Sequence, residues 1–158
     1  MNLTKQIAQH LRDVHFGENW TSSNLKETLA GVTWQQATTK VYNLNTISAL
    51  VYHINYFVAA VLNVLEGNRL NAHDKYSFDH PPIQSADDWK KLMDKMWSDA
   101  ENLACLIEQL PGDKLEEIFA DEKYGTYFRN LLGIIEHTHY HLGQIVLIKK
   151  MLAQPKGI

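Results

Sequence analysis

Three of the chain's eight histidines lie within five residues, in the run His137-Thr138-His139-Tyr140-His141. In an α-helix successive residues are rotated by about 100°, so positions four apart share one face. His137 and His141 can therefore bind one metal ion together, whereas His139 points in nearly the opposite direction. Zinc and related ions usually take at least three protein ligands, so this pair needs a third residue from elsewhere in the chain.

His53 is the candidate for the third ligand. It lies in the apolar stretch Ala49–Phe57, where a buried imidazole needs a partner for its ring nitrogens. Three imidazoles that leave a coordination position open for water or substrate are typical of catalytic sites, because structural zinc sites are closed by four ligands and rich in cysteine. Neutral imidazole binds zinc, nickel, copper or ferrous iron, and these ligands alone do not choose among the four.

The alternative is that these histidines are capped core or interface residues that lie four apart by chance. A zincin-type peptidase is excluded, because its glutamate must directly follow the first histidine and Thr138 stands there. Gln144 leans toward the face of His141, and we predict that it orients a ligand or a metal-bound water; it is otherwise an ordinary surface amide. We expect His139 to be a packing or supporting residue. The remaining histidines are predicted to be solvated: His10, His15, His73 and His80.

Helical periodicity predicts four helices to carry these residues. They run from about Leu3 to His15, Thr46 to Leu65, Ser85 to Leu110 and Thr126 to Ala153. Two long connections, residues 17–45 and 68–84, join the first three. The expected fold is all-α, a four-helix bundle with two long connections forming a single domain over residues 1–158.

The predicted second and fourth helices carry more apolar surface than one bundle core needs. The second helix has two apolar stripes. In the fourth, the main stripe is predicted to exclude the histidine face, and the surplus predicts a homodimer. That main stripe comprises Phe128, Leu131, Leu132, Ile135, Leu142 and Val146, whereas Ile134, Ile145, Ile148 and Leu152 lie off it.

Composition narrows the class of protein further. The net charge is −3 and no basic stripe is present, so we expect no nucleic-acid binding. The apolar stretch from Ile47 to Leu65 is interrupted by polar residues, so we expect no membrane span. One cysteine, Cys105, excludes an intrachain disulfide and favours a reducing compartment, with the cytoplasm as the expected location. Trp20, on the first connection, is expected to pack its loop, and the alternative is that it covers a pocket.

Three stretches resemble the DinB/YfiT-like superfamily of metal-dependent four-helix proteins, and the resemblance covers nearly the whole chain. One is the histidine within an apolar second helix, Leu50-Val51-Tyr52-His53-Ile54. Another is the fourth-helix motif of histidine, three residues, histidine and then Gly-Gln, here His137 to Gln144. The last is Gly17-Glu18-Asn19-Trp20, followed by Leu25 and Leu29.

The resemblance implies that His53, His137 and His141 bind a divalent metal, often nickel or zinc, in an up-down-down-up bundle that often forms homodimers. Leu142 departs from the pattern, because many members have arginine before Gly-Gln. Some members of the superfamily are S-transferases or isomerases that depend on a small thiol cofactor. We therefore expect a metal-dependent transferase or hydrolase acting on an unidentified small molecule, with a small thiol as a candidate cofactor. The alternative is a non-catalytic metal-holding or stress-linked binding protein.

Overall fold

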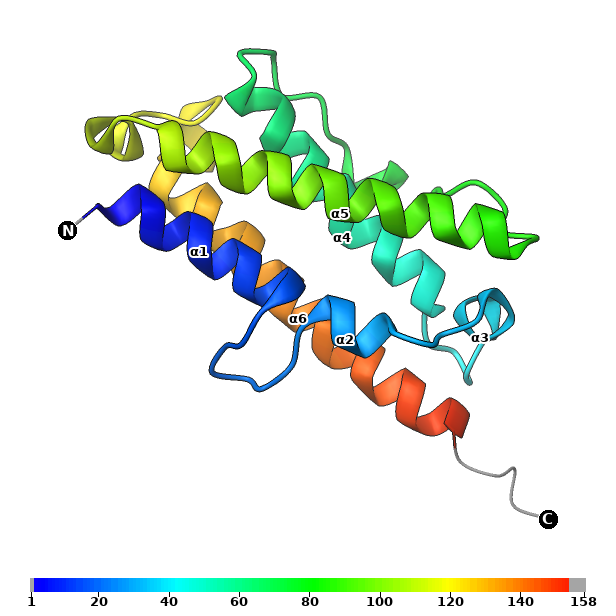
Figure 1. The fold of residues 1–158 in the computed structure, drawn as a ribbon. Helices are drawn as coiled ribbons and strands as arrows, with labels where there is room; N and C mark the ends of the chain where they lie inside the picture. Colours follow the sequence, from blue (N-terminus) through cyan, green and yellow to red (C-terminus); the bar gives the residue numbers. More distant parts are fainter. Residues whose placement is uncertain (1, 154–158) are drawn as a thin grey trace.

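The computed structural model describes residues 2–153, which are almost entirely helical (Figure 1). The described residues contain no named strand, only an isolated bridge between Ile118 and Thr126. The four long helices are α1 (Leu3–Phe16), α4 (Ile47–Leu65), α5 (Ala86–Gln109) and α6 (Tyr127–Ala153). The short elements are α2 (Leu25–Leu29), α3 (Trp34–Thr38) and three 3₁₀ turns, η1 (Asp74–Tyr76), η2 (Gly112–Glu116) and η3 (Glu122–Tyr124).

Side-chain caps define where the long helices begin. The side-chain oxygens of Asn2, Thr46 and Ser85 each accept a hydrogen bond from the backbone N–H three residues later. Such caps satisfy donors that have no partner inside the helix. The all-α class is confirmed, and the four predicted long helices are present with nearly the predicted bounds.

The long helices pack in a ring, in which α1 contacts α5 and α6, and α4 also contacts α5 and α6. Figure 1 shows that α1 and α6 run in one direction and that α4 and α5 run in the other. Because α4 and α5 are parallel neighbours, the chain must travel back along the whole of α4 before α5 begins. Residues 66–85 make this return, and they therefore lie beside α4.

The apolar face of α6 differs from the prediction. Ile145 and Ile148, which periodicity predicts to lie off the main stripe, are buried. Phe128, predicted to lie on that stripe, is 39% exposed. The physical reason is that α6 contacts α4 on one side and α1 and α2 on another, so it buries a broader face than one stripe. Ile145 and Ile148 are thus used within the chain and are not surplus surface for a second subunit.

Helix α4 is the central helix of the core. By length and composition alone it could cross a membrane, but most of it is buried among its neighbours. Its main stripe packs into the core, including the fully buried Ile47, Leu50 and Ile54. Buried core helices commonly have this composition.

Two predictions about single residues are wrong. Trp20 does not pack its loop, because its side chain is 101% exposed. His15 is not solvated: it is fully buried, and its Nδ1 lies 2.8 Å from the carbonyl oxygen of Leu11. Its spacing of four from Leu11 and eight from Ile7 places it on the core face of α1.

Candidate metal centre

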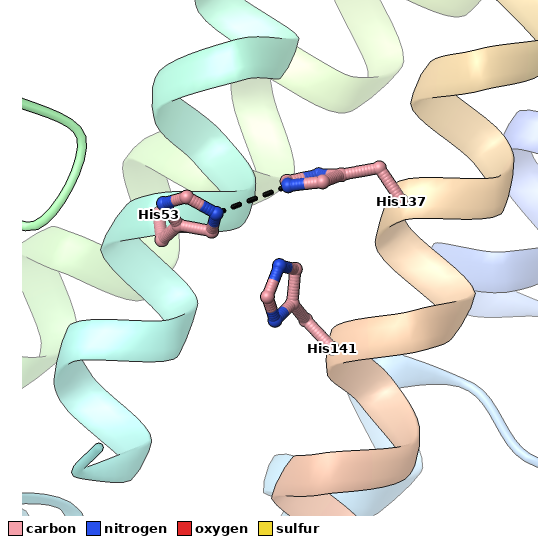
Figure 2. A group of neighbouring side chains, drawn as sticks. All are labelled: His53, His137 and His141. Carbon is pink, nitrogen blue, oxygen red and sulfur yellow. Dashed lines mark hydrogen bonds between the residues drawn. The ribbon is translucent and has the colours of Figure 1, made fainter. Parts of the chain in front are cut away.

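Figure 2 shows the rings of His53, His137 and His141 turned toward one another across the gap between α4 and α6. One ligand nitrogen from each ring lies within 4.8 Å of those of the other two. The closest pair is Nε2 of His53 and Nε2 of His137, 3.1 Å apart. His53 and His141 are buried, and His137 is partly exposed. The structure therefore brings together the three histidines that the sequence singled out.

The tautomer of His53 follows from its contact with the 66–85 connection. Its Nδ1 lies 2.9 Å from Oγ of Ser77, and that hydroxyl donates to the backbone carbonyl of Asp74 at 2.7 Å. Because the hydroxyl has a single proton, it must accept from His53, so Nδ1 carries the hydrogen. The lone pair of His53 is then on Nε2, which faces the other two histidines.

A similar contact determines the tautomer of His141. Its Nδ1 lies 2.7 Å from Oε1 of Gln144, an acceptor, so Nδ1 again carries the hydrogen. The lone pair is left on Nε2. Metal-binding histidines almost always donate their other N–H to a fixed partner in this way, which sets ring orientation and raises the basicity of the ligand.

His137 differs from the other two because its Nδ1 is buried and has no hydrogen-bond partner among the described residues. Its Nε2 faces the Nε2 lone pair of His53, so this contact requires either a proton or a cation between the two nitrogens. In tetrahedral zinc sites ligand nitrogens are about 3.4 Å apart, close to the observed spacing of this pair. The donor set and its orientation fit a divalent ion.

Burial keeps the cluster uncharged. The pKa of His137 is lowered to about 4, first by burial and then by the neighbouring His141 and His53. The pKa of His53 is also lowered, mainly by burial and next by His141. Both rings are therefore neutral near pH 7, and neutral imidazole is the form that binds metal.

Aromatic rings cover the sides of the cluster. Phe78 stacks on His53 with ring centroids 3.9 Å apart, and Phe57 meets both His53 and His137 edge to face. Tyr140 lies edge to face against His141. These rings hold the imidazoles in place and limit the access of water to them.

A cavity of about 350 Å³ opens beside His53 and His137. Phe57 forms part of its wall, and the polar side chains of Asp74 and Asn130 also line it. Sequence reasoning missed Asp74, Ser77 and Phe78, because no spacing rule relates a loop residue to His53. Asn130 could have been found, since it lies seven residues before His137 and so on the same face of α6.

The other predicted residues lie away from the cluster. His139 points elsewhere and lines a separate pocket with His10 and Trp20, and its Nδ1 is buried without a partner among the described residues. Cys105 contacts Arg12 and Glu101 on α1 and α5. Neither residue is placed to share a ligand with the three histidines.

Comparisons with family models, with curated proteins and with solved structures give no match. The class of this site therefore rests on its own residues and their geometry.

Proposed function

We propose that His53, His137 and His141 form a catalytic centre for one divalent ion, and that the protein is a metal-dependent transferase or hydrolase. The observation that carries this proposal is the orientation of the imidazoles. Ser77 and Gln144 occupy Nδ1 of His53 and His141, which leaves both Nε2 lone pairs directed at His137. Such outer contacts are common in metal sites. A histidine in an ordinary core also needs a partner for its ring, but ordinary packing does not require two rings to turn their lone pairs toward a third.

A divalent ion in this position supplies Lewis acidity, which lowers the pKa of a water or thiol that it binds. The chain supplies the remaining groups. Asp74 presents a carboxylate at the same cavity, where it can accept a proton from the reacting molecule. The side-chain amide of Asn130 can orient a substrate, and Phe57 and Phe78 restrict water around His53.

The shape of the site favours an enzyme over the alternative, a protein that only holds metal. A site that only holds metal is expected to be sealed by bulky side chains. Neither Trp20 nor Tyr56, two large aromatic residues near the histidines in sequence or on the long connection, closes this site. Trp20 is fully exposed and lines a different pocket. Tyr56 is occupied elsewhere, because its hydroxyl donates to the backbone carbonyl of His73. The cavity beside His53 and His137, to which Asp74 and Asn130 add polar side chains, leaves room for a small substrate.

We also propose that the chain is a DinB/YfiT-like four-helix bundle that uses zinc or nickel, with a small thiol as cofactor, in the cytoplasm. The motif from His137 to Gln144 supports this assignment. The opposite directions of α1 and α6 relative to α4 and α5 support it as well, because they correspond to an up-down-down-up arrangement (Figure 1).

Turnover assays on protein loaded with zinc or nickel test the enzymatic proposal. A chromogenic ester reports hydrolysis, and 1-chloro-2,4-dinitrobenzene with a small thiol reports transfer. We expect a rate that disappears on chelation and falls at least tenfold in Asp74→Asn while metal content is kept. Asp79→Asn, in the same connection but outside the cavity lining, is the matched control. Metal bound in full with no turnover of either kind would favour the metal-holding alternative.

A further inference from the structure

We propose that a second cavity, formed by α4, α5 and the 66–85 connection, is a binding site for an uncharged, ring-containing small molecule. Its volume is about 740 Å³, roughly twice that of the cavity beside His53, and none of the three histidines lines it. Tyr52 and Tyr56 flank His53 in sequence, and they place this cavity on a neighbouring face of α4. The two sites are therefore distinct, and this proposal does not depend on the metal.

The walls of this cavity are mainly apolar. Cavities of about 300–1,000 Å³ that are lined by apolar and aromatic side chains are typical of small-molecule sites. Tyrosine rings and a pair of prolines provide flat surfaces, against which a ring system packs well. The apolar and aromatic lining includes Tyr52, Tyr56, Ala60, Pro82, Ile83 and Leu92.

The charged groups at the rim argue against a charged ligand. Lys91 and Lys95 line the cavity, but each forms an ion pair at 2.7 Å, with Asp87 and Asp99 respectively. Asp88, also in the lining, accepts hydrogen bonds at the start of α5. Because each lysine already has a carboxylate partner, neither is free to bind an anionic ligand, which favours an uncharged occupant.

Asn55 indicates which polar group the ligand of this cavity would carry. Its side chain is 95% buried and its Nδ2 donates to Asp99 at 2.8 Å, while its Oδ1 has no partner among the described residues. A buried amide oxygen without a donor is unfavourable. Asn55 belongs to the cavity lining, but its Oδ1 has almost no accessible surface. A ligand that carries an N–H or O–H group can therefore provide the missing donor only where the Asn55 side chain shifts to expose this oxygen.

The uncharged dye N-phenyl-1-naphthylamine has the required chemistry: two aromatic systems, one N–H and no charge. We expect its fluorescence to rise on titration with the full chain, with saturation at one dye per chain. 8-Anilinonaphthalene-1-sulfonate, the same ring system with a negative charge, should bind at least tenfold more weakly. Dye binding should persist in His53→Ala, which removes a residue of the other cavity.

Substitutions within the cavity locate the dye. Ala59→Trp fills the space and should weaken binding at least tenfold, and Ala60→Phe is a second, smaller filling. Ala153→Trp, at an exposed position outside the lining, is the matched control. Circular dichroism checks that each variant folds. Undiminished binding in both filled variants, or equal binding of the sulfonate, would overturn the proposal. A dimer that becomes a monomer in Ala59→Trp would instead identify this face as a subunit interface.

Discussion

His53 on α4 and Ser77 in the connection that follows it form the contact that orients the candidate metal centre. Nδ1 of His53 lies 2.9 Å from Oγ of Ser77, 24 residues later in the chain. Because the Ser77 hydroxyl donates to the carbonyl of Asp74, it can only accept from His53. One serine thus decides which nitrogen of His53 faces His137 and His141.

Replacing this serine should weaken metal binding without removing a ligand. In Ser77→Ala the tautomer and orientation of His53 are no longer held, and loss of such a contact typically costs about 10- to 100-fold in metal affinity. Competition with a chromophoric chelator measures the change. Ser98→Ala, an exposed serine on α5, should leave the affinity as it is. An affinity in Ser77→Ala equal to that of the wild type would show that Ser77 has no orienting role.

Tyr56→Phe should have a smaller effect of the same kind. The Tyr56 hydroxyl accepts from the backbone N–H of His73 at 2.9 Å and donates to its carbonyl at 3.1 Å. It thereby holds the connection that carries Ser77. Loss of about 1 kcal/mol of hydrogen bonding predicts a roughly fivefold loss of metal affinity at most. Tyr42→Phe, at an exposed tyrosine, is the control. A larger loss than in Ser77→Ala would contradict the proposed order of contacts.

The stability of the metal-free protein should fall in mild acid. Burial lowers the pKa of His15 to about 4, while the unfolded chain has a histidine pKa of about 6.5. Between these values the unfolded state binds more protons, so stability rises with pH across this window. The contribution of His15 is complete above about pH 6.5 and is lost as pH falls toward 4.

Urea unfolding at a series of pH values, with chelator present, measures this dependence. The free energy of unfolding should fall between pH 6.5 and 4, and in His15→Leu this fall should be smaller than in the wild type by about 2–3 kcal/mol. Exposed His10→Leu should leave the slope as it is. A slope that is the same in His15→Leu and the wild type would mean that His15 is not buried in its neutral form.

A homodimer remains a prediction, but the surface expected to form it has changed. Ile145 and Ile148 are buried within the chain, whereas Tyr140 and Leu147, seven apart on α6, are exposed. We expect light scattering at micromolar concentration to give the mass of two chains, and Leu147→Lys to reduce it to one. A wild-type mass of one chain would show that the prediction of a dimer is wrong.

Periodicity and spacing could predict the long helices and the convergence of His137 and His141, because both depend on the local geometry of a helix. His53 could be proposed because a lone imidazole in an apolar stretch needs a partner. Ser77 and Asp74 could not be found in this way, because their positions depend on how the connection returns along α4. Contacts between a loop and a helix leave no periodic signal in the sequence.

The faces of α6 were harder to predict for a related reason. A helix that packs on one neighbour buries one stripe, but α6 contacts α4, α1 and α2. Periodicity does not show how many neighbours a helix has, so it predicts Phe128 in the core and leaves Ile145 outside it. The burial of His15 was missed for a different reason. Its spacing from Leu11 places it on the core face of α1, but a titratable side chain is usually expected at the surface.

Metal content tests the central claim most directly. Protein purified without a histidine tag should contain about one divalent ion per chain by elemental analysis. His137→Ala should lose most of it, whereas His139→Ala, two residues away in the same helix, should keep it, because its ring lines a different pocket. Equal metal content in the two variants, or no bound ion in the wild type after incubation with zinc or nickel, would contradict the three-histidine centre.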